Sequence, residues 1–160
     1  MTKAPACSRA GRVVTVRVEA SVLLPVTPER AWAFVLRWEE QSRWMRDAVW
    51  VRVVTLEREG AGARIEVRNR VLNVSMFTEQ LEVTAWDPPR RLEMTHRGFV
   101  RGVGTWWFES EAAGTRFVWT EALSLPIPIL GTLALWVYRP FMKRLMRSGL
   151  ANLQRLIEAA

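Results

Sequence analysis

The sequence predicts an α+β protein in which a curved, seven-stranded antiparallel sheet surrounds one long C-terminal helix, with two short helices after the first strand. Three observations support this prediction. Residues 12–125 contain about seven segments with a period of two, joined mostly by short turns, as in antiparallel sheets. The period changes to 3.6 after residue 128. A sheet of this size with one amphipathic helix must curl around that helix to bury its inner face.

The first strand and the helices after it have clear local signals. Apolar and small residues alternate with polar ones over residues 12–25, which indicates a half-buried strand. Thr27 is a good N-cap, Pro28 suits the first helical position, and Glu29 favours the positive end of a helix. A second short helix is expected over residues 39–45.

The remaining elements follow from the same two periods. Turns are expected where glycine or proline interrupts the alternation, and Pro140 is expected either to kink the last helix or to mark its start. The expected strands cover residues 48–57, 63–70, 75–86, 90–98, 103–110 and 115–125, with turns at 58–62, 71–74, 87–89 and 111–114. The stripe of the last helix consists of Met142, Leu145, Met146, Gly149, Leu153, Leu156 and Ile157.

Composition is typical of a single globular domain. A chain of 160 residues can bury one core, so we expect a flexible leader over residues 1–12 and one domain over residues 13–160. The net charge of +7 favours anionic partners. The single cysteine, Cys7, excludes an internal disulfide and a cysteine-based zinc site. No apolar signal segment is visible near the N-terminus, so a cytoplasmic location is expected.

Four segments, in their order along the chain, resemble a known superfamily. They are residues 26–44, 86–94, 114–123 and 150–159. Together they resemble the START-like, helix-grip (SRPBCC) superfamily, in particular the bacterial polyketide cyclase/dehydrase and lipid transport branch. This resemblance implies an apolar ligand cavity between the sheet and the C-terminal helix. It does not imply one activity, because members include binders of lipids, quinones or polyketides as well as cyclases and dehydratases.

The alternation predicts which side chains face this cavity. The alternative interpretation is that many of them form a plain packed core. The predicted ligand-binding residues are Ile65, Val67, Asn69, Phe77, Met94, His96, Trp106, Phe108, Phe117, Trp119, Met142, Leu145, Met146 and Gly149.

The only histidine of the chain, His96, shares the inward face with two carboxylates, Glu79 and Glu121. Charged groups on an apolar face are costly unless they are paired. The three residues are therefore candidates either for general acid–base catalysis or for a structural hydrogen bond. Their spacing does not indicate a metal site, and no cofactor is expected.

A second candidate feature is the apolar run over residues 126–138, which is too short to span a bilayer. It precedes a basic cluster formed by Arg139, Lys143, Arg144 and Arg147. This arrangement suggests peripheral contact with an anionic membrane. The alternative is a buried loop followed by the solvated back of a helix. Arginines on the outer sheet face alternate with glutamates, so no nucleic-acid partner is expected.

The sequence thus favours a protein that binds or transfers a hydrophobic small molecule such as a lipid, a quinone or a polyketide-like compound. Two alternatives remain open: a polyketide cyclase/dehydratase-like enzyme that uses the same cavity, and a regulatory interaction module without a ligand. The oligomeric state is not predicted.

Overall fold

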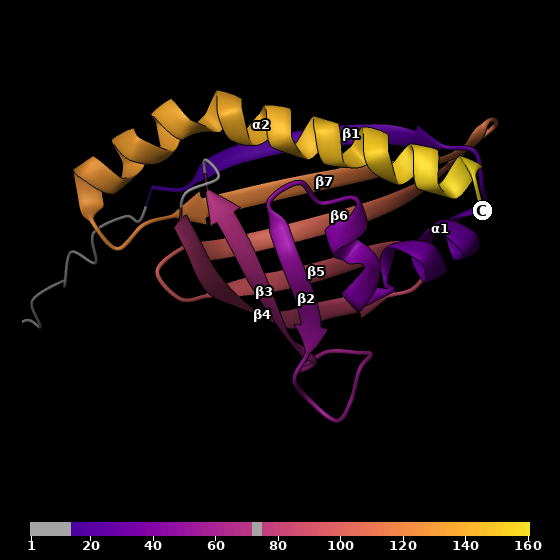
Figure 1. The fold of residues 1–160 in the computed structure, drawn as a ribbon, viewed down its shortest axis with the longest axis horizontal. Helices are drawn as coiled ribbons and strands as arrows, with labels where there is room; N and C mark the ends of the chain where they lie inside the picture. Colours follow the sequence, from indigo (N-terminus) through magenta and orange to yellow (C-terminus); the bar gives the residue numbers. More distant parts are fainter. Residues whose placement is uncertain (1–13, 72–74) are drawn as a thin grey trace, which may run out of the picture.

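The structure is a computed structural model that describes residues 14–71 and 75–160 (Figure 1). It confirms the predicted class: a curved, seven-stranded antiparallel sheet with the strand order β1-β7-β6-β5-β4-β3-β2, together with a long C-terminal helix. The elements are β1 Val16–Leu24, α1 Pro28–Val35, the 3-10 helix η1 Trp38–Arg43, β2 Ala48–Val53, β3 Arg64–Val71, β4 Ser75–Asp87, β5 Arg91–Arg97, β6 Arg101–Glu111, β7 Gly114–Ser124 and α2 Pro128–Glu158. The predicted leader over residues 1–12 and most of the predicted turn over residues 71–74 lie outside the described residues.

The first helix begins as its sequence predicts. Thr27 adopts an extended conformation, and its side chain accepts a hydrogen bond from the Arg30 N–H. The second helix is a short 3-10 helix that starts at Trp38, one residue before the predicted start. The Gln41 side chain donates to the carbonyl oxygen of Val35 at 2.9 Å and so ties η1 to the end of α1.

The connection between β2 and β3 is longer than predicted, because β2 ends at Val53 and not at residue 57. The Thr55 hydroxyl donates to the Glu57 carbonyl oxygen and accepts from the Arg64 N–H. The Val54 N–H still donates to the Arg64 carbonyl oxygen, and these local bonds replace strand pairing after it. Gly60 and Gly62 then turn the chain at φ values of 90° and 92°, which side chains rarely allow.

Helix α2 begins at Pro128, well before the predicted stripe, and continues through Pro140. The interpretation of residues 126–138 as a buried loop is therefore wrong. Pro140 cannot donate to the carbonyl of Trp136, but both residues are exposed, so water can reach this carbonyl. Figure 1 shows α2 as one curved helix that lies along the β1 side of the sheet, and its closest contacts are with β1.

One end of the concave face is filled by an aromatic core. Trp106 has its ring centroid 5.8 Å from that of Phe117, 6.2 Å from that of Trp44 and 6.2 Å from that of Trp119. Phe108 lies 5.2 Å from Trp32 by the same measure. Edge-to-face pairs of this kind add to the stabilisation from apolar burial. The concave face is therefore closed by packed rings at this end.

Candidate functional site

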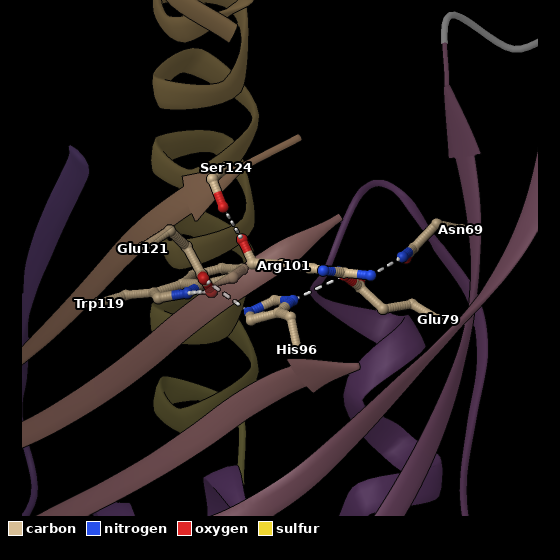
Figure 2. A network of polar contacts seen from close by, with 7 residues as sticks. All are labelled: Asn69, Glu79, His96, Arg101, Trp119, Glu121 and Ser124. Carbon is tan, nitrogen blue, oxygen red and sulfur yellow. Dashed lines mark hydrogen bonds and ion pairs between the residues drawn. The ribbon is translucent and has the colours of Figure 1, made fainter. Parts of the chain in front are cut away.

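A buried polar cluster lies on the concave face of the sheet (Figure 2). Its central residue is His96 on β5, whose two ring nitrogens both contact carboxylates. Nδ1 lies 2.6 Å from Oε1 of Glu79 on β4, and Nε2 lies 2.8 Å from Oε2 of Glu121 on β7. The three side chains are only 9–13% exposed. The structure thus brings together the three residues predicted as catalytic candidates.

Two further side chains complete the hydrogen bonding of the carboxylates. The Asn69 amide on β3 donates to Oε2 of Glu79 at 3.0 Å. The indole N–H of Trp119 on β7 donates to Oε1 of Glu121 at 2.7 Å. Every carboxylate oxygen of the pair therefore has one protein donor, as buried charges require.

A glycine on β6 makes the contact between His96 and Glu121 sterically feasible. These residues are on β5 and β7, and β6 lies between them. His96 pairs with Gly102 across the β5–β6 ladder, and Gly104 pairs with Glu121 across the β6–β7 ladder. A Cβ atom on Gly104 would lie 2.9 Å from Oε1 of Glu121. The histidine and the carboxylate therefore meet above a part of β6 where Gly104 has no side chain to separate them.

The charge state of His96 follows from its neighbours. Burial alone would lower the pKa of the imidazole, but the charges and hydrogen bonds of Glu121 and Glu79 outweigh burial and raise the pKa from 6.5 to about 10. His96 is therefore an imidazolium ion at neutral pH. Its two N–H groups both donate to carboxylates, so it has no nitrogen lone pair for a metal ion. Within residues 14–71 and 75–160, no group of three or more His, Cys, Asp or Glu side chains is placed to hold a metal ion.

The sequence interpretation missed two ionisable residues near this cluster. Burial raises the pKa of Asp47, immediately before β2, and the charges of Glu79 and Glu121 raise it further. Burial also raises the pKa of Tyr138 on α2, with a contribution from Asp47. Neither residue belongs to an alternating strand segment, so the period-two pattern could not identify them. Only the fold brings a third carboxyl group within electrostatic range of Glu79 and Glu121.

The predicted ligand-binding residues divide into two groups. Ile65, Val67, Met94, Trp106, Phe108, Phe117 and Met146 are buried members of the main packed core. Asn69, Phe77, His96, Trp119, Met142 and Leu145 lie in or near the polar end, where Phe77 is 38% exposed and most of the others are partly buried. Gly149 belongs to neither group. A Cβ atom there would lie 3.1 Å from the Trp44 carbonyl oxygen, so this glycine lets α2 approach η1 closely.

Comparisons with known proteins agree with this architecture. The chain matches the family described as polyketide cyclase / dehydrase and lipid transport over residues 15–158. The structure of TTHA0849 from Thermus thermophilus is 27% identical, has a TM-score of 0.76, and the match covers 90% of this chain and 98% of that one. A search of curated proteins found no match to this sequence.

Structures of aromatase/cyclases share the fold at lower identity. The Zhui aromatase/cyclase from Streptomyces sp. R1128 is 15% identical with a TM-score of 0.74, and the match covers 90% of this chain and 94% of that one. The di-domain aromatase/cyclase BexL, from the BE-7585A biosynthetic pathway, is 13% identical with a TM-score of 0.71, over 92% of this chain and 51% of that one. Since the family match spans nearly all of the chain, this protein belongs to the polyketide cyclase / dehydrase and lipid transport family.

Proposed function

We propose that this protein binds a hydrophobic small molecule with hydroxyl groups between the sheet and α2, and that the His96 cluster holds a hydroxyl of that molecule. The observation that carries the proposal is one buried, charged cluster on an otherwise apolar concave face. Ligand sites typically combine apolar walls with a few polar groups that fix orientation. The match to the polyketide cyclase / dehydrase and lipid transport family supports a polyketide-like ligand.

The hydrogen bonding of the cluster indicates which ligand groups it would accept. Both His96 N–H groups and the Trp119 indole N–H already donate to Glu79 or Glu121. Carboxylate oxygens can accept more than one hydrogen bond. The hydrogen bonds that the cluster can still make are therefore mainly ones in which a ligand group donates to Glu79 or Glu121. A ligand hydroxyl is such a donor. Only the second amide hydrogen of Asn69 could still serve a ligand acceptor within this cluster.

A second polar feature suits a ligand carbonyl. The indole nitrogen of Trp106 is buried and has no hydrogen-bond partner among the described residues. An unpaired buried donor is costly, by about 1–3 kcal/mol. Trp106 pairs with Trp119 across the β6–β7 ladder and so lies next to the cluster. Trp106 is packed among other rings, so a ligand carbonyl would reach its indole nitrogen only if a neighbouring ring moved. A polyketide-like compound, with both hydroxyl and carbonyl groups, would then satisfy both features.

Incomplete packing around the cluster also supports ligand binding. Phe77, Leu81, Trp119 and Met142 are only partly buried, although the side chains at the aromatic end are nearly inaccessible. Helix α2 lies mainly against β1, so the part of the concave face near β4 and β5 has less cover from the helix. A hydrophobic ligand would bury these partly exposed side chains.

The test compares two probes that differ in one donor. We expect 9-phenanthrol to bind at least about tenfold more tightly than 9-methoxyphenanthrene in calorimetric titration, because only the phenol can donate to a carboxylate. Glu79→Gln should reduce this preference several-fold. Glu109→Gln, an exposed residue on β6, is the matched control and should leave it unchanged. Equal affinity for the two probes, or no binding of either, would contradict the proposal.

Asp47 favours a second candidate function, acid–base catalysis on the bound ligand. Burial raises the pKa of Asp47, whereas Glu79 and Glu121 both contact His96, so the environments of these carboxyl groups differ as those of an acid and a base do. In the dehydration of a β-hydroxy ketone, Glu79 or Glu121 would remove the α-proton. Asp47 would protonate the departing hydroxyl, which leaves as water while the C=C bond forms. His96 would hold its proton throughout, since its pKa of about 10 is far above neutrality.

An activity assay and an affinity measurement on the same variant distinguish catalysis from ligand binding alone. With 4-hydroxy-4-phenylbutan-2-one as the substrate, catalysis predicts formation of the conjugated enone, and Asp47→Asn should reduce the rate at least about a hundredfold. The same variant should keep its affinity for 9-phenanthrol within about threefold. If no enone forms above the buffer rate across a panel of β-hydroxy ketones, the binding function stands without the catalytic one.

A further inference from the structure

The first half of α2 presents an apolar surface that no described part of the chain covers. Its side chains recur at the spacing of one helix face, and all are more than half exposed: Ile129 is 85% exposed and Leu133, the least exposed, is 59% exposed. We call this surface the α2 apolar face; it consists of Ile129, Leu130, Leu133, Trp136 and Val137. Monomeric soluble proteins rarely expose a contiguous group of large apolar side chains, and such groups mark interaction sites.

The opposite face of the same helix segment is fixed to the sheet. Leu135 is buried against Val16 on β1 and Leu123 on β7. Arg139 also donates to the carbonyl oxygen of Arg17 on β1 at 3.0 Å. The α2 apolar face is therefore held outward by contacts on its inner side, and Figure 1 shows this end of the helix projecting past the ends of the strands.

Basic residues continue the outward face toward the C-terminus. Lys143, Arg144 and Arg147 are exposed and follow the α2 apolar face at helical spacing. No aspartate or glutamate occurs between Pro128 and Ile157. The outward side of α2 is thus apolar over residues 128–137, and every charged residue over 138–147 is a cation.

We propose that the outward side of α2 docks onto an anionic lipid bilayer. Ile129, Leu130 and Leu133 would enter the boundary between headgroups and acyl chains, and Trp136 would lie at the headgroup level, where tryptophan is enriched. Lys143, Arg144 and Arg147 would meet the anionic headgroups. None of the helices in the described ranges is apolar over enough length to cross a membrane.

The charge pattern favours a bilayer over a second copy of the chain. In a symmetric contact the same surface lies on both partners, so the cations of one copy would lie either beside those of the other, in a parallel pair, or beyond the ends of the apolar contact, in an antiparallel pair. The segment contains no acidic residue to neutralise them. An anionic bilayer complements both parts of the surface at once. Docking of α2 onto a bilayer does not require the ligand proposed for the concave face, and vesicle binding can be measured without that ligand.

Co-sedimentation with vesicles tests the proposal. We expect the full chain to sediment with vesicles of phosphatidylcholine and phosphatidylglycerol (7:3), and at least about tenfold less with phosphatidylcholine alone or at high salt. Lys143→Gln/Arg144→Gln/Arg147→Gln should remove most of the anionic preference. Leu133→Ser/Trp136→Ser should reduce binding to both vesicle types at least about tenfold. All of these side chains are on the surface, and circular dichroism would verify that the variants fold.

Matched substitutions elsewhere distinguish an effect of this surface from an effect of the overall charge or hydrophobicity of the protein. Arg30→Gln/Arg68→Gln/Arg70→Gln removes the same number of cations outside α2, and Leu56→Ser removes a fully exposed leucine from the β2–β3 loop. Both controls should bind vesicles about as well as the wild type. Absence of vesicle binding would overturn the proposal. So would a stable dimer that Trp136→Ser dissociates, which would assign this face to a second copy of the chain.

Discussion

His96 stabilises the fold as a charged residue within a buried cluster. A histidine between two carboxylates is unfavourable to bury unless each charge and each donor has a partner, and here both conditions are met. The carboxylates keep the imidazole protonated, because its pKa rises to about 10. The carboxylates need the imidazolium in turn, since without it two like charges would face each other in a nonpolar environment.

This coupling makes the stability of the protein depend on pH in a defined direction. The pKa of His96 is higher in the folded state, about 10, than its ordinary value of 6.5. The imidazolium therefore contributes its full stabilisation below about pH 6.5, and this contribution is lost as the pH rises toward 10. His96→Gln should lower the free energy of unfolding by about 3–5 kcal/mol near neutrality, because two buried carboxylates lose their cation.

Urea denaturation of both proteins between pH 6 and pH 10 measures this effect. The difference between wild type and His96→Gln should narrow as the pH approaches 10. The exposed pair Arg17 and Glu19 offers a control: Glu19→Gln should change stability by less than about 1 kcal/mol at every pH. A difference for His96→Gln that does not vary with pH would show that the imidazolium charge has no part in stability.

At the scale of single elements, β6 shows how a strand can contribute by lacking side chains. Gly104 leaves the space that the Glu121 carboxylate occupies when it contacts His96, whereas a Cβ atom on Gly102 would meet the β7 backbone at Ala122. Glycine inside a strand normally lowers stability, because it has no side chain to pack and loses more conformational freedom on folding. In β6 this loss is offset by a buried ion pair between two strands that are not neighbours.

A single methyl group on β6 should therefore disturb the cluster. Gly104→Ala places a Cβ atom 2.9 Å from Oε1 of Glu121, so the carboxylate must move away from His96 or Trp119. We expect a loss of about 1–3 kcal/mol in the free energy of unfolding. We also expect a lower pKa of His96, measured by NMR titration of the imidazole. Gly98→Ala is the control, since a Cβ atom there has no neighbour within 4 Å. Equal behaviour of the two variants would refute this role for Gly104.

At the scale of the whole molecule, the concave face has two ends with different roles. Phe117 and Phe77 were both predicted to face a ligand. The structure places Phe117 in the aromatic core with 0% exposure and leaves Phe77 38% exposed at the polar end. The aromatic end accounts for stability, and the polar end is the region proposed for ligand binding. The predicted residues therefore lie on one face of the sheet but in two different environments, the packed aromatic end and the partly exposed polar end.

Substitution of the two phenylalanines distinguishes these environments. Phe117→Ala should lower the free energy of unfolding by about 3–5 kcal/mol, because it leaves a cavity in packed rings. Phe77→Ala should cost less than about 1.5 kcal/mol, since much of its ring is already in water. Under the proposed function, Phe77→Ala should also weaken the binding of 9-phenanthrol more than it affects unfolding. Equal stability losses would contradict a division of the face into two ends.

The sequence was sufficient for the features that depend on local periodicity. Alternation identified the strands and assigned Glu79, His96 and Glu121 to one face, because side-chain direction in a strand depends only on position along the chain. The change of period after residue 128 agrees with the start of α2 at Pro128. The sequence left open whether Pro140 marked that start, because a mostly apolar run has too few polar residues to define a helical period.

Contacts between distant residues were decided only by the tertiary structure. Alternation could not show that His96 reaches Glu121 across β6, because this depends on strand order and on a glycine of a third strand. Nor could it bring Asp47 within electrostatic range of the two glutamates, since Asp47 precedes β2 and is placed by the hydrogen bond that its carbonyl accepts from the Arg70 N–H on β3. The sequence by itself determined which face each strand residue occupies. The folded sheet decided which of those residues meet, because that depends on distances between strands that are far apart in the chain.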